Sequence, residues 1–470
     1  MAANAELPPI TYVVEHKFDG LTINLTYENG ELIGAATRGN GITGEEILPQ
    51  VRTIRSVPLK IPFAGRMEVH GEGYMRLSVL EKYNRTASEM LKNPRNAAAG
   101  ALRNLDPAVT AARRLDACFY DVGYIEGKAF KTQKEMMDFL RENRFPVSDC
   151  EIECPNLQRA IEAVHAIEQS RGDLDYMIDG AVIKICDFAT RDALGYTDKF
   201  PRWAIAYKFE AEEVTTLLED VTWQIGRTGK LTPLAHVSPV ELAGATVRKA
   251  TLNNYTDILR KRVKIGARVW IRRSNEVIPE IMGRVDEFEP GEREIEKPTV
   301  CPECGAPVVR VEGEAAHKCT GDSCPAQLLR RLMHFASRDA MDIEGLGPAI
   351  LEKLLDVGHI KSAADLYELS KEDIAALEKM GDKSAENLIS AIEKSKQNDL
   401  YRLLFALGIQ LNGLKSSKTI AAHFRTMENI MEASEEELTA IPDIGEKTAA
   451  NICSFFSRPE NKELIFRLKV

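Results

Sequence analysis

The chain has 470 residues, of which 44% are hydrophobic and 28% charged, a balance typical of a soluble globular protein whose length predicts about three or four domains. No stretch approaches the ~20 apolar residues of a membrane helix, and residues 1–14 have neither the cationic start nor the apolar run of a secretory signal. Membrane and secreted classes are therefore excluded. Nine cysteines in such a chain indicate the reducing cytoplasm and serve as thiols or metal ligands.

The net charge of −10 does not by itself suggest a nucleic-acid partner, but the charge is unevenly distributed. Residues 225–275 contain only two acidic residues, Glu241 and Asp257. The same stretch contains eleven basic residues: Arg227, Lys230, Arg248, Lys249, Arg260, Lys261, Arg262, Lys264, Arg268, Arg272 and Arg273. Such a focused positive field favours DNA binding. The alternative is a solvated face that acidic neighbours balance in space.

The first predicted strand ends at Lys17, which has a carboxylate two residues away on either side. Val13-Val14 is typical of a buried strand, and Asp19-Gly20 predicts the tight turn that closes it. A lysine becomes a nucleophile when burial or neighbouring cations lower its pKa, whereas carboxylates have the opposite effect. Lys17 therefore needs further cations or a metal nearby; otherwise it is only a solvated residue before a turn.

A β-hairpin, an arginine between glycine-rich neighbours and another strand are predicted next. Leu21–Tyr27 and Glu31–Thr37 alternate apolar and polar residues on either side of the turn signal Asn29-Gly30. Arg38 follows the hairpin in a segment that suits contact with a phosphate or a ribose. The strand Met67–Glu72 ends on a carboxylate.

Helical segments and two lysine-bearing strands follow. Asn93-Pro94 caps a predicted helix that carries Arg95 and Arg103, and the apolar spacing of residues 157–171 is helical. The strands Ile178–Ile185 and Trp203–Lys208 place Lys184 and Lys208 on faces with small residues. Each lysine then points into a space that something else must fill; the alternative is an edge-strand lysine that discourages aggregation.

These segments, in this order, resemble the motifs of the nucleotidyltransferases of the DNA ligase and RNA-capping superfamily, and those of the bacterial NAD-dependent DNA ligases in particular. The motifs are Lys17-x-Asp19-Gly20, Arg38, Glu72, Asp179-Gly180 with Lys184, and Lys208, and the segments Asn93–Gly100 and Pro201–Ala204 are distinctive matches. The resemblance extends over nearly the whole chain. It departs from the family at His70, where arginine is usual, and at Asn40, where aspartate is common.

The resemblance implies that Lys17 attacks the α-phosphate of NAD, forms a covalent lysyl-AMP and releases nicotinamide mononucleotide. The residues implied to line the nucleotide site are Glu15, Arg38, Glu72, Lys184 and Lys208, the last beside the phosphates. Asp19 and Asp179 are implied to hold waters around Mg²⁺ or Mn²⁺. Supporting contacts to phosphate or DNA are implied for Arg95, Arg103, Arg171 and Arg227. Phosphoryl transfer depends mainly on positioning and charge neutralisation, so Lys184, Lys208 and the metal would supply the positive charge that Lys17 needs.

The next two segments predict a small barrel and a zinc site. Short alternating strands from Trp223 onward, together with the basic stretch, suggest a five-stranded barrel. The resemblance implies that this barrel is an OB-fold that binds DNA. Residues 286–291 are typical of an acidic linker.

Cys301, Cys304, Cys319 and Cys324 have the spacing of a closed, tetrahedral and therefore structural Zn²⁺ site. His317 could substitute for Cys319. The remaining cysteines, expected to be ordinary thiols, are Cys118, Cys150, Cys154, Cys186 and Cys453.

The last part of the chain contains an internal repeat. Short segments between helical stretches end on Gly347, Gly381, Gly413 and Gly445, at steps of 34, 32 and 32 residues. Such periods also occur in helical solenoids, but the aromatic-rich consensus of those families is missing. Glycine hairpins between helices expose backbone N–H groups that bind phosphate. Four helix–hairpin–helix motifs on duplex DNA are the better interpretation, with the third, at Asn412-Gly413, the most irregular.

Together these features predict a multidomain α+β protein. The expected parts are a nucleotidyltransferase (ATP-grasp-like ligase) domain over residues 1–212, an OB-fold barrel over 213–298, a four-cysteine zinc finger over 299–326 and an all-α helix–hairpin–helix array over 327–470. The resemblance implies a cytoplasmic, monomeric DNA ligase that seals nicks in duplex DNA in replication and repair. One alternative is an ATP-dependent ligase or capping enzyme, against which the zinc module and hairpins argue. Another is a DNA-binding fragment without catalysis.

The resemblance also implies that two regions usual in these ligases are absent from this sequence. A region that recognises the nicotinamide half of NAD usually precedes the lysine motif, and a BRCT domain usually follows the hairpins. Only sixteen residues precede Lys17 here. Positioning of the leaving group can lower the activation barrier by ~7–11 kcal/mol. The chain is therefore expected to adenylate itself poorly with NAD and still to seal pre-adenylated nicks.

Overall fold

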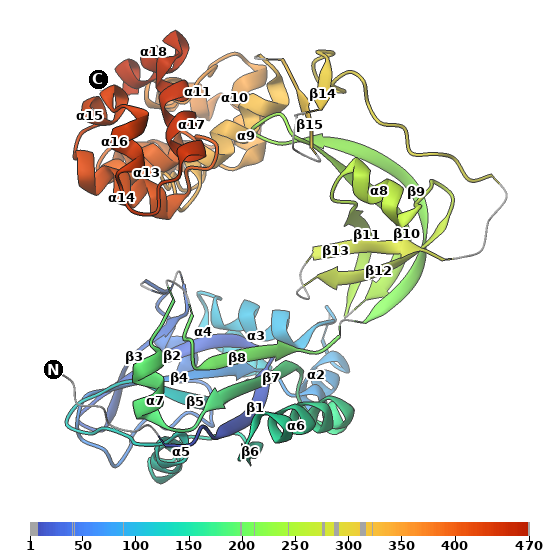
Figure 1. The fold of residues 1–470 in the computed structure, drawn as a ribbon. Coiled ribbons are helices and arrows are strands. Elements are labelled where there is room, and N and C mark those ends of the chain that lie inside the picture. The colour runs from blue at the N-terminus through green and yellow to red at the C-terminus, as the bar shows by residue number, and fades with distance from the viewer. Residues whose placement is uncertain are drawn as a thin grey trace. The chain divides into compact units, whose positions relative to one another are not determined.

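The computed structural model describes residues 8–39, 41, 43–87, 89–197, 200–210, 212–242, 244–274, 278–285, 291–310, 316–321 and 323–468. Asn40 and residues 286–290 of the expected acidic linker lie outside these ranges. The chain divides into two compact units, residues 1–212 with 241–246 and residues 213–240 with 247–470 (Figure 1). Among the described residues, no helix is long and apolar enough to cross a membrane.

Two four-stranded antiparallel sheets form the framework of the first unit. One sheet has the order β6-β1-β7-β8 and the other the order β3-β2-β4-β5. The strands are β1 (Tyr12–Phe18), β2 (Leu21–Glu28), β3 (Glu31–Thr37), β4 (Met67–Tyr74), β5 (Asp116–Ile125), β6 (Glu151–Cys154), β7 (Ile178–Ile185) and β8 (Ala204–Lys208). The predicted hairpin is confirmed, with Asn29 and Gly30 both at positive φ in its turn. Because β1 passes into β2 through Asp19-Gly20, the lysine motif connects the two sheets.

Helices cover these sheets and close the larger core. They are α1 (Leu48–Val51), α2 (Leu77–Asn84), α3 (Pro94–Leu102), α4 (Pro107–Arg113), α5 (Gln133–Glu142), α6 (Leu157–Ser170), the 3₁₀ turn η1 (Arg171–Asp173) and α7 (Phe188–Leu194). The core includes the fully buried Ile23, Tyr27 and Phe119. Asn93 caps α3 as predicted, because its side chain accepts from the Asn96 N–H. Helix α3 ends at Leu102, so Arg103 is its C-cap and not part of it.

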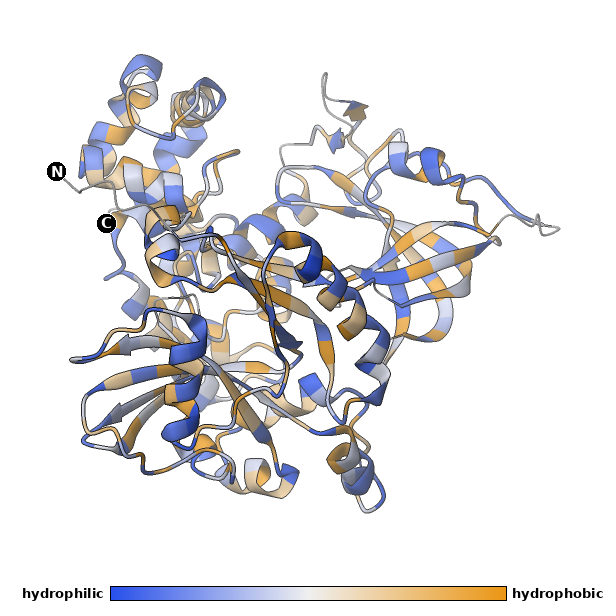
Figure 2. Ribbon diagram, turned by 60° about the horizontal axis from the view of Figure 1, so that its bottom comes forward, coloured by the Kyte–Doolittle hydropathy of each residue, from blue (hydrophilic) through white to orange (hydrophobic). Residues whose placement is uncertain are grey.

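The second unit begins with a closed five-stranded barrel, as expected. Its strands are β9 (Glu213–Ile225), β10 (Leu231–Leu242), β11 (Ala245–Thr251), β12 (Arg268–Ser274) and β13 (Ile278–Arg284), with the helix α8 (Tyr255–Lys261) between β11 and β12. Along β10, Leu231, Ala235 and Val237 are buried and alternate with more exposed residues. This period of two places one face of each strand in the barrel core, and the alternation of colour is visible along the barrel strands in Figure 2.

A small zinc-finger hairpin and a helical array complete this unit. The elements are β14 (Val308–Arg310), β15 (His317–Cys319), α9 (Pro325–Ala336), α10 (Pro348–Asp356), η2 (Ala364–Tyr367), α11 (Lys371–Ala375), α12 (Asp382–Ser395), α13 (Leu400–Ala406), α14 (Leu414–Phe424), α15 (Met427–Glu432), α16 (Glu435–Thr439), α17 (Glu446–Ser457) and α18 (Pro459–Leu468). The helices enclose two cores, one containing Leu351 and Leu388 and the other containing Ile420 and Ile452. Each core therefore supports two hairpins.

Strands β7 and β8 approach so closely that their contact requires a glycine. A Cβ atom on Gly180 would lie 2.1 Å from the backbone oxygen of Tyr207, and backbone cannot give way as a flexible side chain can. We expect Gly180→Ala to destabilise the protein by about 1–3 kcal/mol, measured by urea unfolding. Gly172 has nothing within 4 Å of an added Cβ, so the control Gly172→Ala should stay within about 0.5 kcal/mol of the parent. Equal stabilities of the two variants would contradict the steric argument.

Candidate active site

The strand register brings two lysines and one aspartate together at the end of β1. Lys17 lies opposite Gly180 on β7, and Gly180 lies opposite Lys208 on β8. The Asp179 carboxylate accepts hydrogen bonds from Lys17 Nζ at 2.5 and 2.7 Å, and Lys208 Nζ lies 3.4 Å from it. The Asp179 side chain is 1% exposed and that of Lys17 is 27% exposed. One buried carboxylate thus holds two lysine ammonium groups, and both lysine side chains remain partly exposed.

The carboxylates that flank Lys17 in the sequence pair with other cations. Glu15 Oε2 lies 2.7 Å from Lys184 Nζ, and Asp19 Oδ1 accepts from Arg95 Nη1 at 2.6 Å. The sequence motifs identified Asp179 but not its bond to Lys17, because that pairing depends on the register of β1 against β7. In this arrangement Lys184, which was expected to supply positive charge near Lys17, is already paired with Glu15.

Two carboxyl groups near Lys17 have raised pKa values. Burial raises the pKa of Glu72 to about 7, although a hydrogen bond from Thr22 and the charges of Lys17 and Arg95 oppose the shift. Burial also raises the pKa of Asp19, against the opposing charge and hydrogen bond of Arg95. Glu72 is therefore close to half-protonated at neutral pH, and a cation or a ligand phosphate bound beside it would shift that balance.

The second sheet lines a cavity of about 700 Å³ that includes Arg38, His70 and Tyr120. This volume lies in the range of small-molecule sites. His70 Nδ1 lies 3.4 Å from the Asp121 carboxylate. Burial would raise the pKa of Asp121, but the hydrogen bond from His70 and the charges of Lys184 and His70 together hold that pKa below its usual value. His70, one of the departures from the family, therefore supports a half-buried carboxylate beside the cavity.

The four arginines expected to support phosphate or DNA lie in different places. Arg95 belongs to the lysine cluster through Asp19. Arg103 Nε lies 3.3 Å from Glu45, and the Arg171 guanidinium lies 5.9 Å from the centre of the Phe209 ring. Arg227 lies in the second unit between β9 and β10, where burial lowers its pKa. Of the four, only Arg95 shares an ion pair with the residues around Lys17.

Four cysteine thiols form the one metal-binding cluster among the residues that the structure describes. The Sγ atoms of Cys301, Cys304, Cys319 and Cys324 all lie within 4.8 Å of one another, as a tetrahedral zinc site requires. His317 is buried, and its ring centre lies 6.2 Å from that of Tyr255. Because four thiols already complete the cluster, His317 is not needed as a ligand. Three of these cysteines, Cys301, Cys319 and Cys324, pack against Ile225 and Leu231 of the barrel. The other five cysteines are free thiols, and burial raises the pKa of Cys150 to about 11.

The four glycine segments of the repeat share one backbone geometry. Two residues before each final glycine, the residue has a positive φ: Gly345 (85°), Lys379 (66°), Leu411 (64°) and Asp443 (68°). The final glycine of each segment is the N-cap of the next helix, α10, α12, α14 or α17, and no side chain caps any of the four. The first N–H groups of these helices are therefore left for an external acceptor such as a phosphate.

The third segment differs in its side chains but not in its backbone. Asn412 occupies the place that Leu346 and Ile444 fill in the first and fourth segments, and it is 3% exposed. Its amide donates to Ser417 Oγ at 3.0 Å, which partly compensates a polar group at a core position. The irregular sequence at Asn412-Gly413 therefore reflects a polar substitution in the core and not a different hairpin.

The basic stretch of the barrel is partly neutralised by acidic neighbours. Lys261 is buried and pairs with Asp257 at 2.7 Å and Glu280 at 3.3 Å. Arg260, Lys264 and Arg272 also lie within 4 Å of acidic side chains. Exposed basic side chains in this stretch include Lys230, Arg248, Lys249, Arg262 and Arg268. The interpretation as a balanced face therefore holds for part of the stretch, and the exposed residues form its candidate DNA contacts.

The fold and these sites together define a nucleotidyltransferase domain followed by an OB-fold barrel, a four-cysteine module and a helix–hairpin–helix array. The sequence matches the NAD-dependent DNA ligase adenylation domain over residues 2–212, the OB-fold domain of these ligases over 215–293 and their C4 zinc finger domain over 300–326. Helix-hairpin-helix models match residues 337–394 and 402–465, which confirms the hairpins over a solenoid.

Relatives named DNA ligase match this chain over about two thirds of their own length. A DNA ligase of Alkaliphilus metalliredigens is 54% identical over 95% of this chain and 68% of its own length. A DNA ligase of Alkaliphilus oremlandii is 53% identical over 98% of this chain and 69% of its own length. One from Clostridium perfringens strain 13 is 49% identical over 99% and 70%. The chain therefore belongs to the NAD-dependent DNA ligase family, a family of enzymes that act on DNA.

Zinc removal should unfold the module that the four thiolates hold together, since metal binding and folding are coupled in such sites. We expect elemental analysis to give about one zinc per chain. Cys301→Ser should lower the zinc content and the thermal stability, whereas the control Cys453→Ser, at a free thiol outside the cluster, should leave the zinc content unchanged. A metal-free protein whose stability is unaffected by Cys301→Ser would contradict the assignment.

Proposed function

We propose that this enzyme seals nicks in duplex DNA through three successive group transfers, as a step in replication and repair. The observation that carries the proposal is the position of Lys17 Nζ, which is partly exposed, bound to the buried Asp179 and opposite Lys208 across β7. A nucleophilic lysine with a second lysine bound to the same carboxylate suits attack on a phosphate.

The nucleophiles of the three transfers are the lysine and the two DNA ends, and NAD supplies the AMP group. First, Lys17 Nζ loses a proton and bonds to the α-phosphorus of NAD, while the bond from that phosphorus to the second phosphate breaks and nicotinamide mononucleotide leaves. Second, the 5′-phosphate at the nick attacks the lysyl-AMP, so the P–N bond breaks and a DNA-adenylate forms. Third, the 3′-hydroxyl attacks the 5′-phosphate with loss of its proton, and AMP leaves. Asp179 is the carboxylate best placed to receive the Lys17 proton.

The nucleotide site is proposed to comprise Glu15, Arg38, Glu72, Lys184 and Lys208. Support comes from the cavity of about 700 Å³ beside Arg38, whose size suits a nucleotide, and from the cations of Lys208 and Arg95 near the lysine. These cations would neutralise the charge that develops on the transferred phosphate.

Asp19 and Asp179 would hold Mg²⁺ or Mn²⁺ through water, and the metal would supply positive charge beside the phosphates. Two carboxylates, both buried in this structure, are a donor set that suits a hard divalent cation. The structure pairs both of them with protein cations instead.

Nicked duplex DNA is the proposed substrate of the barrel and hairpins, with Arg103, Arg171 and Arg227 as supporting contacts. The uncapped helix starts at four glycines and the exposed basic residues of the barrel support backbone recognition independent of sequence. The domain divisions proposed are 1–212, 213–298, 299–326 and 327–470. A monomer in the cytoplasm is proposed, since nine cysteines with no disulfide among them suit a reducing compartment.

Replacement of Lys17 should separate the first transfer from the last. Lys17→Ala should abolish lysyl-AMP formation and still seal a nick supplied already 5′-adenylated, because the third transfer needs no lysine nucleophile. The control Lys60→Ala removes an exposed lysine that pairs with Glu31 and should change neither reaction. Mass spectrometry that finds AMP on another lysine would end the assignment.

The same assays on the parent protein test the expectation of weak NAD use. Radiolabelled self-adenylation with NAD is compared with closure of the adenylated nick. Efficient lysyl-AMP formation would refute the expected weakness. Failure on both substrates would favour the DNA-binding fragment without catalysis.

DNA affinity should fall steeply with salt and depend little on sequence, because phosphate contacts release counterions. Removing one exposed cation, as in Arg248→Gln or Lys249→Gln, should lower the slope of log K against log salt by ~1. The control Arg260→Gln removes a cation already paired with Asp257 and should lower the slope less. A flat salt response would favour the interpretation of the barrel as a solvated face.

A further inference from the structure

A buried chain of hydrogen bonds leads from Glu15 to a residue that none of the motifs includes. Gln133 Nε2 donates to Glu15 Oε1 at 2.7 Å, while Lys184 Nζ lies 2.7 Å from the other carboxylate oxygen, Oε2. Arg191 Nη2 in turn donates to Gln133 Oε1 at 2.9 Å. Glu15 is 4% exposed, Gln133 2% and Arg191 5%. The two oxygens of Glu15 are therefore held separately, one by each partner.

The chemistry of arginine fixes the direction of this chain. A guanidinium only donates hydrogen bonds, so the Gln133 oxygen must face Arg191 and its NH₂ group must face Glu15. With the amide reversed, two donors would meet at Arg191 and two acceptors at Glu15, and both buried pairs would be left unsatisfied. Arg191 therefore sets the orientation of Gln133, and Gln133 sets that of the carboxylate.

Arg191 is itself held in place from three sides. Its guanidinium carbon lies 4.2 Å from the ring centre of Phe188 and 4.3 Å from that of Trp203, and its Nε donates to the Ile185 carbonyl at 2.7 Å. Stacking on two aromatic rings and a bond to the end of β7 leave the planar group little freedom. Burial lowers the pKa of Arg191, but arginine remains charged.

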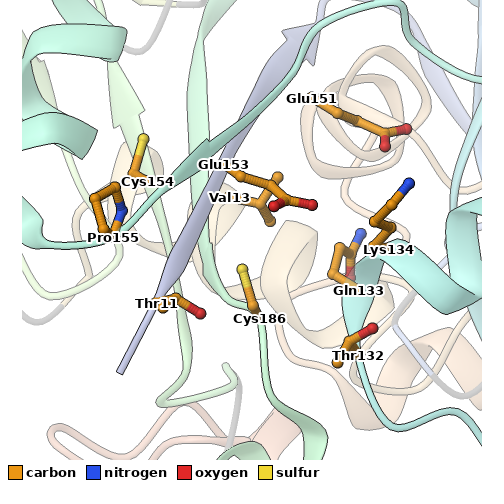
Figure 3. Close-up of a pocket in the computed structure, with 10 residues that line it drawn as sticks. All are labelled: Thr11, Val13, Thr132, Gln133, Lys134, Glu151, Glu153, Cys154, Pro155 and Cys186. Atoms are coloured by element: carbon orange, nitrogen blue, oxygen red, sulfur yellow. The ribbon is translucent and has the colours of Figure 1, made fainter. Parts of the chain in front are cut away.

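Gln133 is not needed to cap its helix or to fill a packed core. Thr132 caps α5 by accepting from the Glu135 N–H. Gln133 also lines a cavity of about 470 Å³ on the β6 side of β1, together with Val13, Glu153 and Cys186 (Figure 3). Its polar group therefore serves the contact with Glu15.

We propose that Gln133 and Arg191 are positioning residues of the nucleotide site, which orient the Glu15 carboxylate toward the bound nucleotide. The inference rests on the proposed function, in which Glu15 and Lys184 line that site. Glu15 pairs with Lys184 and not with the nucleophile Lys17, so its contacts in the proposed site would lie away from the reacting phosphorus and would stabilise ground state and transition state alike. Loss of the orientation should therefore weaken NAD binding and leave the maximum rate of lysyl-AMP formation nearly unchanged.

The test compares NAD binding, by calorimetric titration of the whole chain, with single-turnover lysyl-AMP formation at saturating NAD. Gln133→Met keeps the side-chain volume and removes both hydrogen bonds, and it should raise the dissociation constant for NAD about tenfold with a rate change below about twofold. The control Lys134→Met changes the next residue of α5, which lines the same cavity, and should alter neither quantity.

A double variant separates positioning from a merely structural role. Arg191→Met should weaken NAD binding as Gln133→Met does and should also lower thermal stability, since it loses its stacking. In the Gln133→Met background, Arg191→Met should weaken NAD binding by less than about twofold more, because Arg191 acts through Gln133. The inference would be overturned, and the proposed function would stand, if the two substitutions weakened NAD binding multiplicatively in the double variant. Unchanged NAD binding in Gln133→Met, with a parent that binds NAD, would have the same consequence. A parent chain that binds no NAD would overturn the inference together with the proposed nucleotide site, while closure of the adenylated nick tests the sealing function separately.

Discussion

The buried carboxylate of Asp179 is the group on which the proposed chemistry depends. It is 1% exposed, and a bare charge at such a depth is costly unless cations pair with it. Lys17 and Lys208 provide that pairing, and the close approach of β7 and β8 at Gly180 brings Lys208 within reach. The need to neutralise one buried charge therefore draws the nucleophile and a second cation to the same point. Glu15 and Asp19 each pair with a cation of their own, Lys184 and Arg95, whereas Glu72 accepts a hydrogen bond from Thr22.

The parts expected to bind DNA use two different physical devices. The barrel presents exposed basic side chains, whose attraction for phosphate is long-ranged and screened by salt. The helical array instead presents backbone N–H groups at four helix starts where glycine leaves no side-chain cap. In most other helices with a polar N-cap residue, such as α5 and α6, the N-cap side chain accepts a hydrogen bond from a backbone N–H of the first turn. Uncapped ends that recur in all four hairpins are therefore a feature of this array, and they explain how an acidic chain can hold a polyanion.

Much of the architecture could be predicted from local patterns. Period-two alternation identified β7 to its last residue, the Asn29-Gly30 signal identified the hairpin, and cysteine spacing identified the zinc ligands. These signals are local, because turn geometry, strand pleat and short metal loops are set by residues close in the chain. The roles of the individual site residues came from resemblance. Gln133 was missed because a glutamine at the start of a helix carries no sequence signal, and its importance depends on a partner 118 residues away.

The sequence by itself determined the elements, the order of the modules and the identity of the nucleophile motif. Only the tertiary structure decided which charges meet. Glu15 and Asp19 are the nearest carboxylates to Lys17 along the chain, yet neither is its hydrogen-bonded partner, because the bend at Asp19-Gly20 turns Asp19 toward Arg95 while antiparallel pairing brings Asp179 across from β7. Electrostatic energy depends on distance in space, and those distances are fixed by strand register and close backbone packing, to which residues far apart in the sequence contribute together.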